Sequence, residues 1–143
     1  MNRIILIISF LFMGSGFAYS QNLPEEQVPS PVKDKLYAQF KAADVSWEME
    51  DNIYEAQYLE NGMNKSIQIN ISGEVILVET QIDPVVMPLT IHNYINEVYQ
   101  GAVMGNAEFI ETIDDNFYGV ELTYNGNVIE LIFDRTGNFL KLG

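Results

Sequence analysis

The chain has 143 residues and a formal net charge of −13 at pH 7, from 7 basic and 20 acidic residues. General nucleic-acid or anionic-membrane binders neutralise phosphate with clustered lysine and arginine, so this charge balance argues against both partners. Hydrophobic residues make up 48% of the sequence, enough for a core and too much for a disordered acidic tail. The absence of cysteine excludes disulfides, thiolate metal sites, cysteine nucleophiles and lipid attachment to a cysteine.

The first 20 residues have the three parts of a secretory signal. Arg3 gives a positive start, residues 4–13 are almost entirely apolar, and the small residues Ala18 and Ser20 precede a cleavage site before Gln21. The apolar stretch is too short to cross a bilayer core of about 30 Å. We therefore expect a signal peptide over 1–20, a periplasmic or secreted protein, and no membrane span after cleavage.

The next segment, residues 21–31, is rich in proline and contains two adjacent glutamates. This composition is typical of an extended leader. Beyond it, Val32, Leu36 and Phe40 follow helical spacing, and Pro31 can occupy the first turn, where its missing N–H costs nothing. These positions predict a first helix over 32–41.

The spacing then changes to an alternation of apolar and polar residues, which is typical of strands with one buried face. Between two such stretches, Asn61 and Gly62 form a strong hairpin signal because both residues tolerate positive φ. Ser72 and Gly73 mark a second turn. The pattern predicts four strands in a meander, at 45–50, 53–59, 67–71 and 75–82.

A proline-containing linker at 83–88 separates this meander from the clearest amphipathic stripe in the chain. Apolar residues from Ile91 to Tyr99 recur at helical spacing and predict a second helix. After a glycine-containing loop, the alternation returns. It predicts four more strands, at 107–113, 117–124, 128–134 and 138–142.

The two halves match each other at a constant offset. Asn61–Gly62 falls on Asn125–Gly126, 64 positions later, and Gly73 falls on Gly137 at the same spacing. The helices match at an offset of 59, which predicts about five extra residues in the loop after the second helix. The pattern indicates an α+β protein with two tandem copies of one helix plus a four-stranded antiparallel meander, over 32–82 and 89–143.

Several stretches resemble the PepSY-like domains of exported bacterial proteins: the Trp47–Glu50 and Tyr54–Tyr58 strands, the Asn-Gly hairpin, and the apolar strand that ends near Gly73. The segment from Tyr118 to Asn138 is similar, so the resemblance covers nearly all of residues 32–143. It implies one curved antiparallel sheet with the helices on one face, as in beta-lactamase inhibitory protein. It also implies a non-catalytic protein, and it identifies no partner-binding residue.

The sequence offers little catalytic chemistry. His92 is the only histidine and lacks co-ligands, so we expect it to be a solvated helix residue. No serine lies in a Gly-x-Ser-x-Gly elbow, and no phosphate-binding loop or His-Glu-x-x-His pattern occurs. Carboxylate pairs are so frequent that a pair alone does not indicate a glycosidase. We therefore expect no enzymatic activity and no cofactor.

Two ligand-binding alternatives remain open. Residues 114–116, Asp-Asp-Asn, could bind calcium through oxygen atoms, although the matching residues 50–52, Glu-Asp-Asn, favour a repeated turn. The aromatic residues of the predicted strands could form a platform for sugars or peptides, although their alternation favours packing against the helices. A small-ligand or calcium-binding periplasmic protein is therefore the alternative function.

A different set of residues occupies the strand positions left over when the apolar residues face the helices. This uncovered sheet face would be acidic and rich in amides, which suits a basic patch on a protein or peptide. We predict a binding module, monomeric, that docks or inhibits an envelope protein through this face, with plain solubility as the alternative role. The predicted binding residues are Glu48, Glu50, Glu55, Gln57, Gln68, Glu121 and Glu130.

Overall fold

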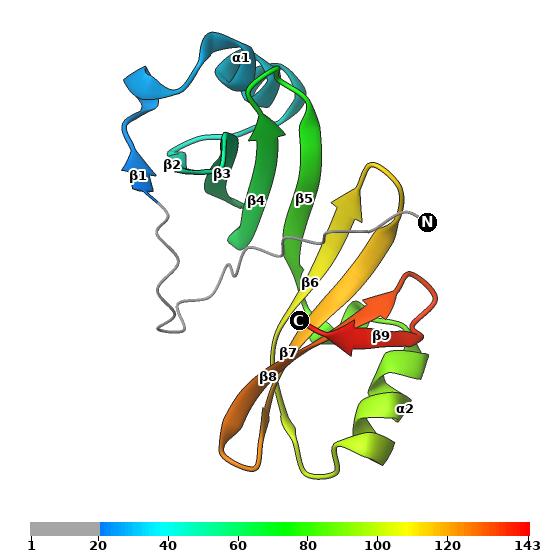
Figure 1. The fold of residues 1–143 in the computed structure, drawn as a ribbon. Coiled ribbons are helices and arrows are strands. Elements are labelled where there is room, and N and C mark those ends of the chain that lie inside the picture. Colours follow the sequence, from blue (N-terminus) through cyan, green and yellow to red (C-terminus); the bar gives the residue numbers. More distant parts are fainter. Residues whose placement is uncertain (1–20) are drawn as a thin grey trace.

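The structure is a computed structural model that describes residues 21–143, so the predicted signal peptide at 1–20 lies outside the described residues. The described part is an α+β fold with two α-helices and one large sheet (Figure 1). In chain order the elements are β1 (Gln21–Leu23), the 3-10 turn η1 (Glu25–Gln27), α1 (Ser30–Gln39), β2 (Ser46–Glu50), β3 (Ile53–Glu60), β4 (Met63–Asn70), β5 (Val75–Ile82), the 3-10 turn η2 (Pro84–Val86), α2 (Leu89–Val98), β6 (Val103–Thr112), β7 (Asn116–Tyr124), β8 (Asn127–Asp134) and β9 (Phe139–Leu142).

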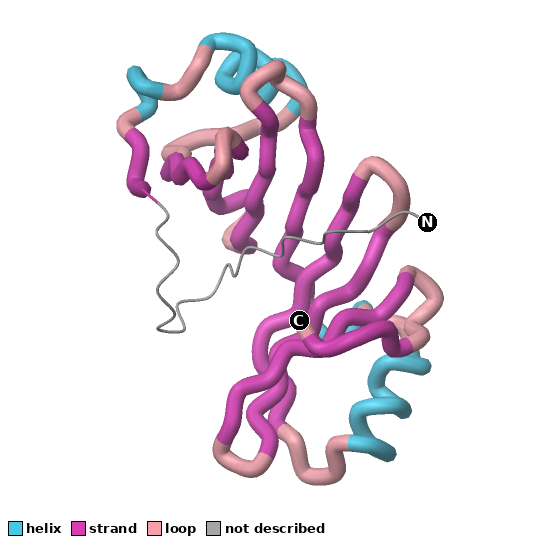
Figure 2. The backbone as a smooth tube through the Cα atoms, viewed as in Figure 1, coloured by secondary structure: helices cyan, strands magenta, loops and turns pink. Residues whose placement is uncertain are grey.

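All nine described strands form one antiparallel sheet in chain order, from β1 to β9. Strand β5 lies in the middle and joins the two halves. Its residue Glu79 is paired with Ser66 of β4 on one side and with Ile110 of β6 on the other. The sheet is strongly twisted, and a helix accompanies each half (Figure 2). None of the helices in residues 21–143 is long and apolar enough to cross a membrane.

Both helices pack on the same face of the sheet. Helix α1 buries Val32 and Leu36 in a core that also contains Val78 of β5. Helix α2 buries its apolar stripe in a second core, and Ile82 of β5 packs against that core. Alternate residues of a strand share a face, so Val78 and Ile82 place both cores on one side. We call this side the helix face. The opposite side is the reverse face, and it includes Glu48, Glu55, Gln57, Ser66, Gln68, Glu79, Glu108, Glu121 and Glu130.

The predicted leader at 21–31 is ordered and belongs to the sheet domain. Strand β1 pairs with β2, with Leu23 opposite Trp47, and Val28 is buried in the first core. A strand of three residues is too short to show an alternation, and the prolines around it are typical of a loop. In the sequence, only two isolated apolar residues, Leu23 and Val28, indicated that this segment is ordered.

The loop after the second helix is not the longer one, and this prediction was wrong. It covers 99–102, whereas the loop after α1 covers 40–45. The additional residues instead lengthen β6, which carries a register shift between Met104 and Ala107. A bulge adds a residue to one strand without breaking the ladder on either side, so an extended strand can absorb the insertion.

The hairpin turns at Asn61–Gly62 and Asn125–Gly126 are confirmed. Asn61 has φ 52° and Asn125 has φ 51°, and the glycine after each also has positive φ. The β2–β3 turn likewise has positive φ at Asp51 and Asn52, whereas Asp114 and Asp115 do not. The Asp-Asp-Asn segment is thus a different turn from its sequence counterpart, contrary to the repeated turn that we expected.

Candidate functional site

The seven residues predicted for the uncovered sheet face all lie on the reverse face. Across neighbouring strands, Glu48 is paired with Glu55, and Glu55 with Gln68. In the other half, Glu121 is paired with Glu130. The remaining two share this side by strand alternation: Gln57 on β3, and Glu50 at the exposed end of β2. The structure therefore brings the predicted residues together in two groups, one on β2–β4 and one on β7–β8.

The centre of the reverse face is not uniformly polar, and the expectation that apolar side chains all face the helices was wrong there. Leu77, Ile110, Phe117 and Ile132 form a buried apolar cluster on this side. The central strands contain unbroken apolar runs, from Val75 to Val78 and from Leu131 to Phe133, rather than strict alternation. Such runs indicate strands with apolar residues on both faces, and this signal was available in the sequence.

Glu55 is the anchor of the first polar group. Its Oε1 accepts a hydrogen bond from Ser66 Oγ and another, of 3.1 Å, from Gln57 Nε2. Ser66 is fully buried, and Gln68 is 5% exposed. This half of the reverse face is therefore a packed hydrogen-bonded layer rather than a set of freely solvated side chains.

A second acidic group lies across the middle of the sheet and contains two residues that the sequence analysis missed. We call Glu79, Glu108 and Glu130 the acid cluster. Glu79 is 0% exposed, Glu108 is 6% exposed, and Glu130 is half-buried. Neither carboxyl oxygen of Glu79 has a hydrogen-bond partner in the structure, and the same holds for Oε2 of Glu130. Unsatisfied buried polar atoms are uncommon, and each is a reason to consider a functional role.

Burial, together with the negative charges of Glu108, Glu55 and Glu130, raises the pKa of Glu79 to about 10. Burial also raises the pKa of Glu108 to about 8, with contributions from the charge of Glu130 and a hydrogen bond to it. The pKa of Glu130 is raised by burial, against the opposing effect of the hydrogen bond with Glu108. The acid cluster therefore holds protons at neutral pH.

A glycine makes room for these carboxyls. Gly119 is paired with Glu108 on β6 and with Ile132 on β8. A Cβ atom at Gly119 would lie 2.9 Å from Glu108 Oε1 and 3.3 Å from Glu130 Oε1. The missing side chain leaves a gap in which the two carboxyl groups meet.

The acid cluster has little positive charge around it. Lys141 of β9 is paired with Ile132, and its charge lowers the pKa of Glu130 slightly against the effect of burial. The ion pair of the described residues joins Lys65 to Glu60 at 3.0 Å, on another part of the sheet. No cation therefore neutralises the acid cluster at hydrogen-bond distance within residues 21–143.

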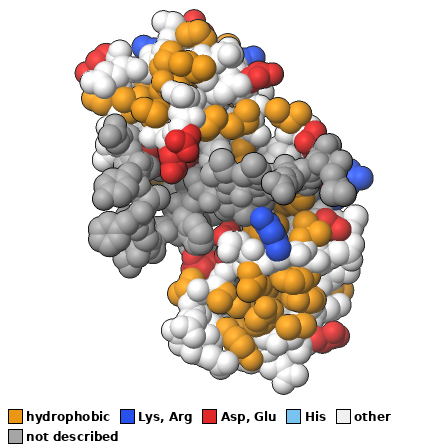
Figure 3. Space-filling model, in the orientation of Figure 1, with side chains coloured by type: hydrophobic (Ala, Val, Ile, Leu, Met, Phe, Trp, Pro, Cys, Tyr) orange, Lys and Arg blue, Asp and Glu red, His pale blue; other side chains and the backbone are white. Residues whose placement is uncertain are grey.

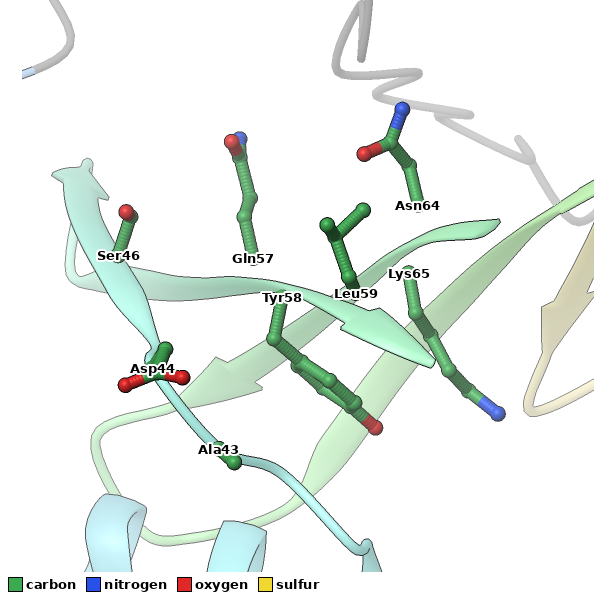
Figure 4. A pocket seen from close by; sticks show the side chains of 8 residues that line it. All are labelled: Ala43, Asp44, Ser46, Gln57, Tyr58, Leu59, Asn64 and Lys65. Carbon is green, nitrogen blue, oxygen red and sulfur yellow. The ribbon is translucent and has the colours of Figure 1, made fainter. Parts of the chain in front are cut away.

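A pocket of about 360 Å³ lies where β2 begins beside the end of β3 (Figure 4). Gln57 and Asn64 point to one side of the sheet, whereas Tyr58 and Lys65 point to the other. Burial, together with the charge of Glu60, raises the pKa of Tyr58 to about 12. Because the polar side chains diverge, this pocket lacks the convergent groups of a small-ligand site. Its lining residues are Ala43, Asp44, Ser46, Gln57, Tyr58, Leu59, Asn64 and Lys65.

The other candidates from the sequence form no site. Within residues 21–143, no group of three or more histidine, cysteine, aspartate or glutamate residues is arranged to hold a metal ion. Asp115 closes its own turn, because its Oδ1 accepts from the Asn116 N–H at 2.8 Å and its N–H donates to Thr112 Oγ1. His92 lies half-buried on α2.

Apolar side chains are exposed on both halves of the molecule, and one patch lies over the half that holds α2, β8 and β9 (Figure 3). Tyr94 stacks on Phe139 with ring centroids 4.9 Å apart, and Tyr99 packs edge-on against Tyr124. These rings border the second core and are only half-buried. They pack along the edge of that core, on the helix face of the sheet.

The sequence matches a family model described as "Putative beta-lactamase-inhibitor-like, PepSY-like" twice, over residues 18–76 and 52–141. A comparison with curated proteins finds no match. A "putative periplasmic" protein from Bacteroides eggerthii is 16% identical with a TM-score of 0.75, covering 81% of this chain and 88% of that chain. A BLIP-like protein from Bacteroides fragilis is 20% identical with a TM-score of 0.69, covering 85% and 86% respectively. At these identities the likeness to both solved structures shows the fold.

Proposed function

Because the chain belongs to the beta-lactamase-inhibitor-like, PepSY-like family, we propose that it is an exported, non-catalytic binding module. Its reverse face docks a protein or peptide of the cell envelope, and inhibition of an envelope enzyme is one form that docking takes. Nucleic acids and membranes are not its partners, since a net charge of −13 repels both. The protein itself works as a monomer.

One observation carries this proposal: the helices cover one face of the sheet, and the other face gathers carboxylates and amides. The two groups of predicted residues, around Glu55 and around Glu121, lie at the two ends of that face. Between them lies the apolar cluster that includes Ile110 and Phe117. The four side chains of that cluster are at most 5% exposed, so the polar groups form the surface that a partner meets. Their acidity would attract a basic partner and accelerate the encounter.

A pull-down from envelope extract tests the docking face. The test variant changes Glu48, Glu50, Glu55 and Glu121 to Gln. We expect partners captured by the wild type to be depleted at least about tenfold, because the complementary charge is lost. The matched control carries the same charge change away from the reverse face, at exposed Glu26, Asp34, Glu97 and Glu111, changed to Gln or Asn. Equal capture by both variants would contradict docking through this face, provided that both melt cooperatively.

We also propose that residues 32–82 and 89–143 are two copies of one unit, joined by the linker at 83–88. The turns after β4 and β8 support this duplication. Asn70 Oδ1 accepts from the N–H groups of Ser72 and Glu74, and Asp134 Oδ1 accepts from those of Thr136 and Asn138, each 64 positions later.

The glycines that follow these turns give a second line of support. Gly73 and Gly137 have φ of 85° and 94°, and each lies against the first turn of the helix in its own unit. A Cβ at Gly73 would lie 2.7 Å from the carbonyl oxygen of Pro31, and one at Gly137 would collide with Thr90. Pro31 and Thr90 are 59 positions apart, the offset of the two helices.

Export through a cleaved signal is the third part of the proposal. The Bacteroides eggerthii protein of similar fold is described as "putative periplasmic", which supports the same compartment here. Mass spectrometry of protein taken from the periplasmic fraction should find an N-terminus at Gln21. Protein that retains Met1 and stays in the cytoplasm would contradict export.

A further inference from the structure

We propose that the acid cluster of Glu79, Glu108 and Glu130 is a recognition site for an arginine side chain of the docking partner. This inference rests on the proposed function, because it names what one part of the reverse face binds. It adds a site that the sequence analysis did not assign, since Glu79 and Glu108 were absent from the predicted binding residues. Arginine entry displaces protons from the cluster to the solvent.

The unsatisfied oxygens of Glu79 are the first observation behind this site. Glu79 is fully buried, and neither Oε1 nor Oε2 has a partner. The neighbour across the ladder, Ser66, donates its hydroxyl to Glu55 instead. Burying a carboxyl without hydrogen bonds is unfavourable. A ligand that brings N–H donors would recover this cost on binding.

The carboxyl groups of the cluster suit a flat group with several donors. Those of Glu108 and Glu130 lie together over Gly119, in the space that a Cβ atom would occupy. Apolar Ile110 and Ile132 lie on the same face, as the paired neighbours of Glu79 and of Gly119. A guanidinium is planar, carries five N–H donors in a fork that fits carboxylates, and is weakly hydrated, so apolar walls suit it.

Other cations fit this place less well. A lysine ammonium is a compact, strongly hydrated charge and gains less from apolar walls such as Ile110 and Ile132. A divalent metal ion needs ligand oxygens that converge on one point, and the described residues contain no such arrangement. A lysine derivative and calcium therefore serve as comparison probes in the test below.

Glu130 is the most exposed member of the cluster, and Glu121, its half-buried partner across the ladder, lies beside it. Charged groups face the cluster from several strands, and all but one are acidic. They are Glu55 on β3, Glu121 on β7, Asp134 on β8 and Lys141 on β9, in addition to the three cluster residues.

Binding of a cation in this place is coupled to proton release. Glu108 and Glu130 share a hydrogen bond, which requires a proton on one of them. A guanidinium takes over the role of that proton by donating to both carboxylates. Arginine binding should therefore strengthen as the pH rises from 6 to 9, because fewer protons remain to be displaced.

The test is an NMR titration of the exported protein carrying ¹³C-labelled glutamate, with N-acetyl-argininamide as the probe. We expect the side-chain carboxyl signals of Glu79, Glu108 and Glu130 to shift and saturate at millimolar probe. The apparent affinity should be about tenfold weaker for N-acetyl-lysinamide, which lacks the fork. Equal shifts at exposed Glu97 and Glu111, or an equal response to the lysine probe or to calcium, would overturn the proposal.

Two variants separate the site from general acidity. Glu108→Gln removes one ligand carboxylate, and Gly119→Ala keeps every charge while its Cβ displaces the Glu108 and Glu130 carboxyl groups. Both should lose the saturating shifts, whereas Glu111→Gln should keep them. Retention of the shifts in both cluster variants would contradict the site.

The outcome is distinguishable from that of the pull-down. In one outcome, the four-residue variant loses partner capture while the wild type shows no response to the arginine probe. That result would support docking through the reverse face and overturn only the arginine site. A saturating response at the cluster, with partner capture unaffected by the docking-face changes, would sustain the site and contradict docking through the two predicted groups.

Discussion

At the scale of single residues, the acid cluster ties the stability of the protein to pH. The folded chain holds protons on Glu79 and Glu108 at pH values where an unfolded glutamate is ionised, because both pKa values are raised on folding. The corresponding stability is complete below the unfolded pKa of about 4.3 and is lost as the pH rises toward about 8 and about 10. Each such proton changes the free energy of unfolding by up to about 1.4 kcal/mol per pH unit.

We therefore expect the wild type to melt at a lower temperature at pH 9 than at pH 5. Glu79→Gln, which cannot ionise, should melt higher than the wild type at pH 9 and show a smaller difference between the two pH values. Thermal melts followed by circular dichroism measure both. The exposed Glu97→Gln is the control. An identical pH dependence in Glu79→Gln and in the wild type would contradict a protonated Glu79.

The pKa of Asp134 is lowered on folding, in contrast to those of Glu79 and Glu108, and this shift can also be tested. Hydrogen bonds from Asn138 and Thr136 hold the pKa of Asp134 below its usual value. Its contribution to stability is therefore present at neutral pH and is lost as the pH falls. We expect Asp134→Ala to lower the melting temperature at pH 7, and Asp134→Asn to lower it less, because Asn70 forms the same turn with an amide oxygen. Equal losses would show that the acceptor oxygen is unimportant.

The residue-scale result also shows what alternation can predict. Glu48, Glu55 and Glu121 were placed on the correct face because they stand in strands with regular alternation. Glu79 and Glu108 were missed because each shares its face with an apolar residue two positions away, Leu77 and Ile110 respectively, so alternation alone did not place them on a polar face. The unpartnered oxygens of Glu79 and the hydrogen bond between Glu108 and Glu130 depend on contacts across β4–β8 that no local pattern contains.

At the scale of the elements, two glycines connect the sheet to the helices. Gly73→Ala and Gly137→Ala each combine a positive φ with contact against the first helical turn, at Pro31 and at Thr90 respectively. We expect each to lower the free energy of unfolding by about 2–4 kcal/mol, from backbone strain plus the displaced helix. Gly62→Ala, with positive φ but open space, should cost only about 1 kcal/mol. Urea denaturation measures all three, and equal losses would contradict the helix contact.

The elements themselves could largely be predicted. Apolar residues at helical spacing, such as the stripe from Ile91 to Tyr99, predicted both helices to within a few residues. Hairpin glycines and alternation predicted the strands from β2 to β9 with similar accuracy. The exceptions have physical reasons. Strand β1 forms because it pairs with β2, and β6 is longer because it pairs with β5 and β7. Pairing with a distant strand is not a property of the local sequence.

At the scale of the whole molecule, the shared strand β5 should make the two halves unfold together. Ile67 belongs to the first core and Leu131 to the second, and both are fully buried. We expect Ile67→Ala and Leu131→Ala each to cost about 2–5 kcal/mol and to lower the same single transition. Calorimetry and hydrogen exchange measure this. Two separate transitions, each sensitive to only one of the substitutions, would contradict one continuous folding unit.

The global arrangement was predicted in part. The alternation indicated an antiparallel α+β protein, and the family resemblance implied a single sheet with both helices on one face, which the structure has. The apolar cluster around Ile110 and Phe117 on the reverse face was not expected. It buries apolar side chains on a face that was expected to be wet and acidic throughout.

Site-specific photo-crosslinking in living cells examines the docking claim most directly. A photo-reactive amino acid is placed one position at a time at Glu48 and Glu121 on the reverse face, and at Glu97 and Glu111 away from it. Adducts of defined mass that form only from Glu48 and Glu121 are the result we predict. Adducts that form only from Glu97 or Glu111 would contradict docking through the reverse face. So would the absence of adducts from all four positions while the wild-type protein still captures a partner.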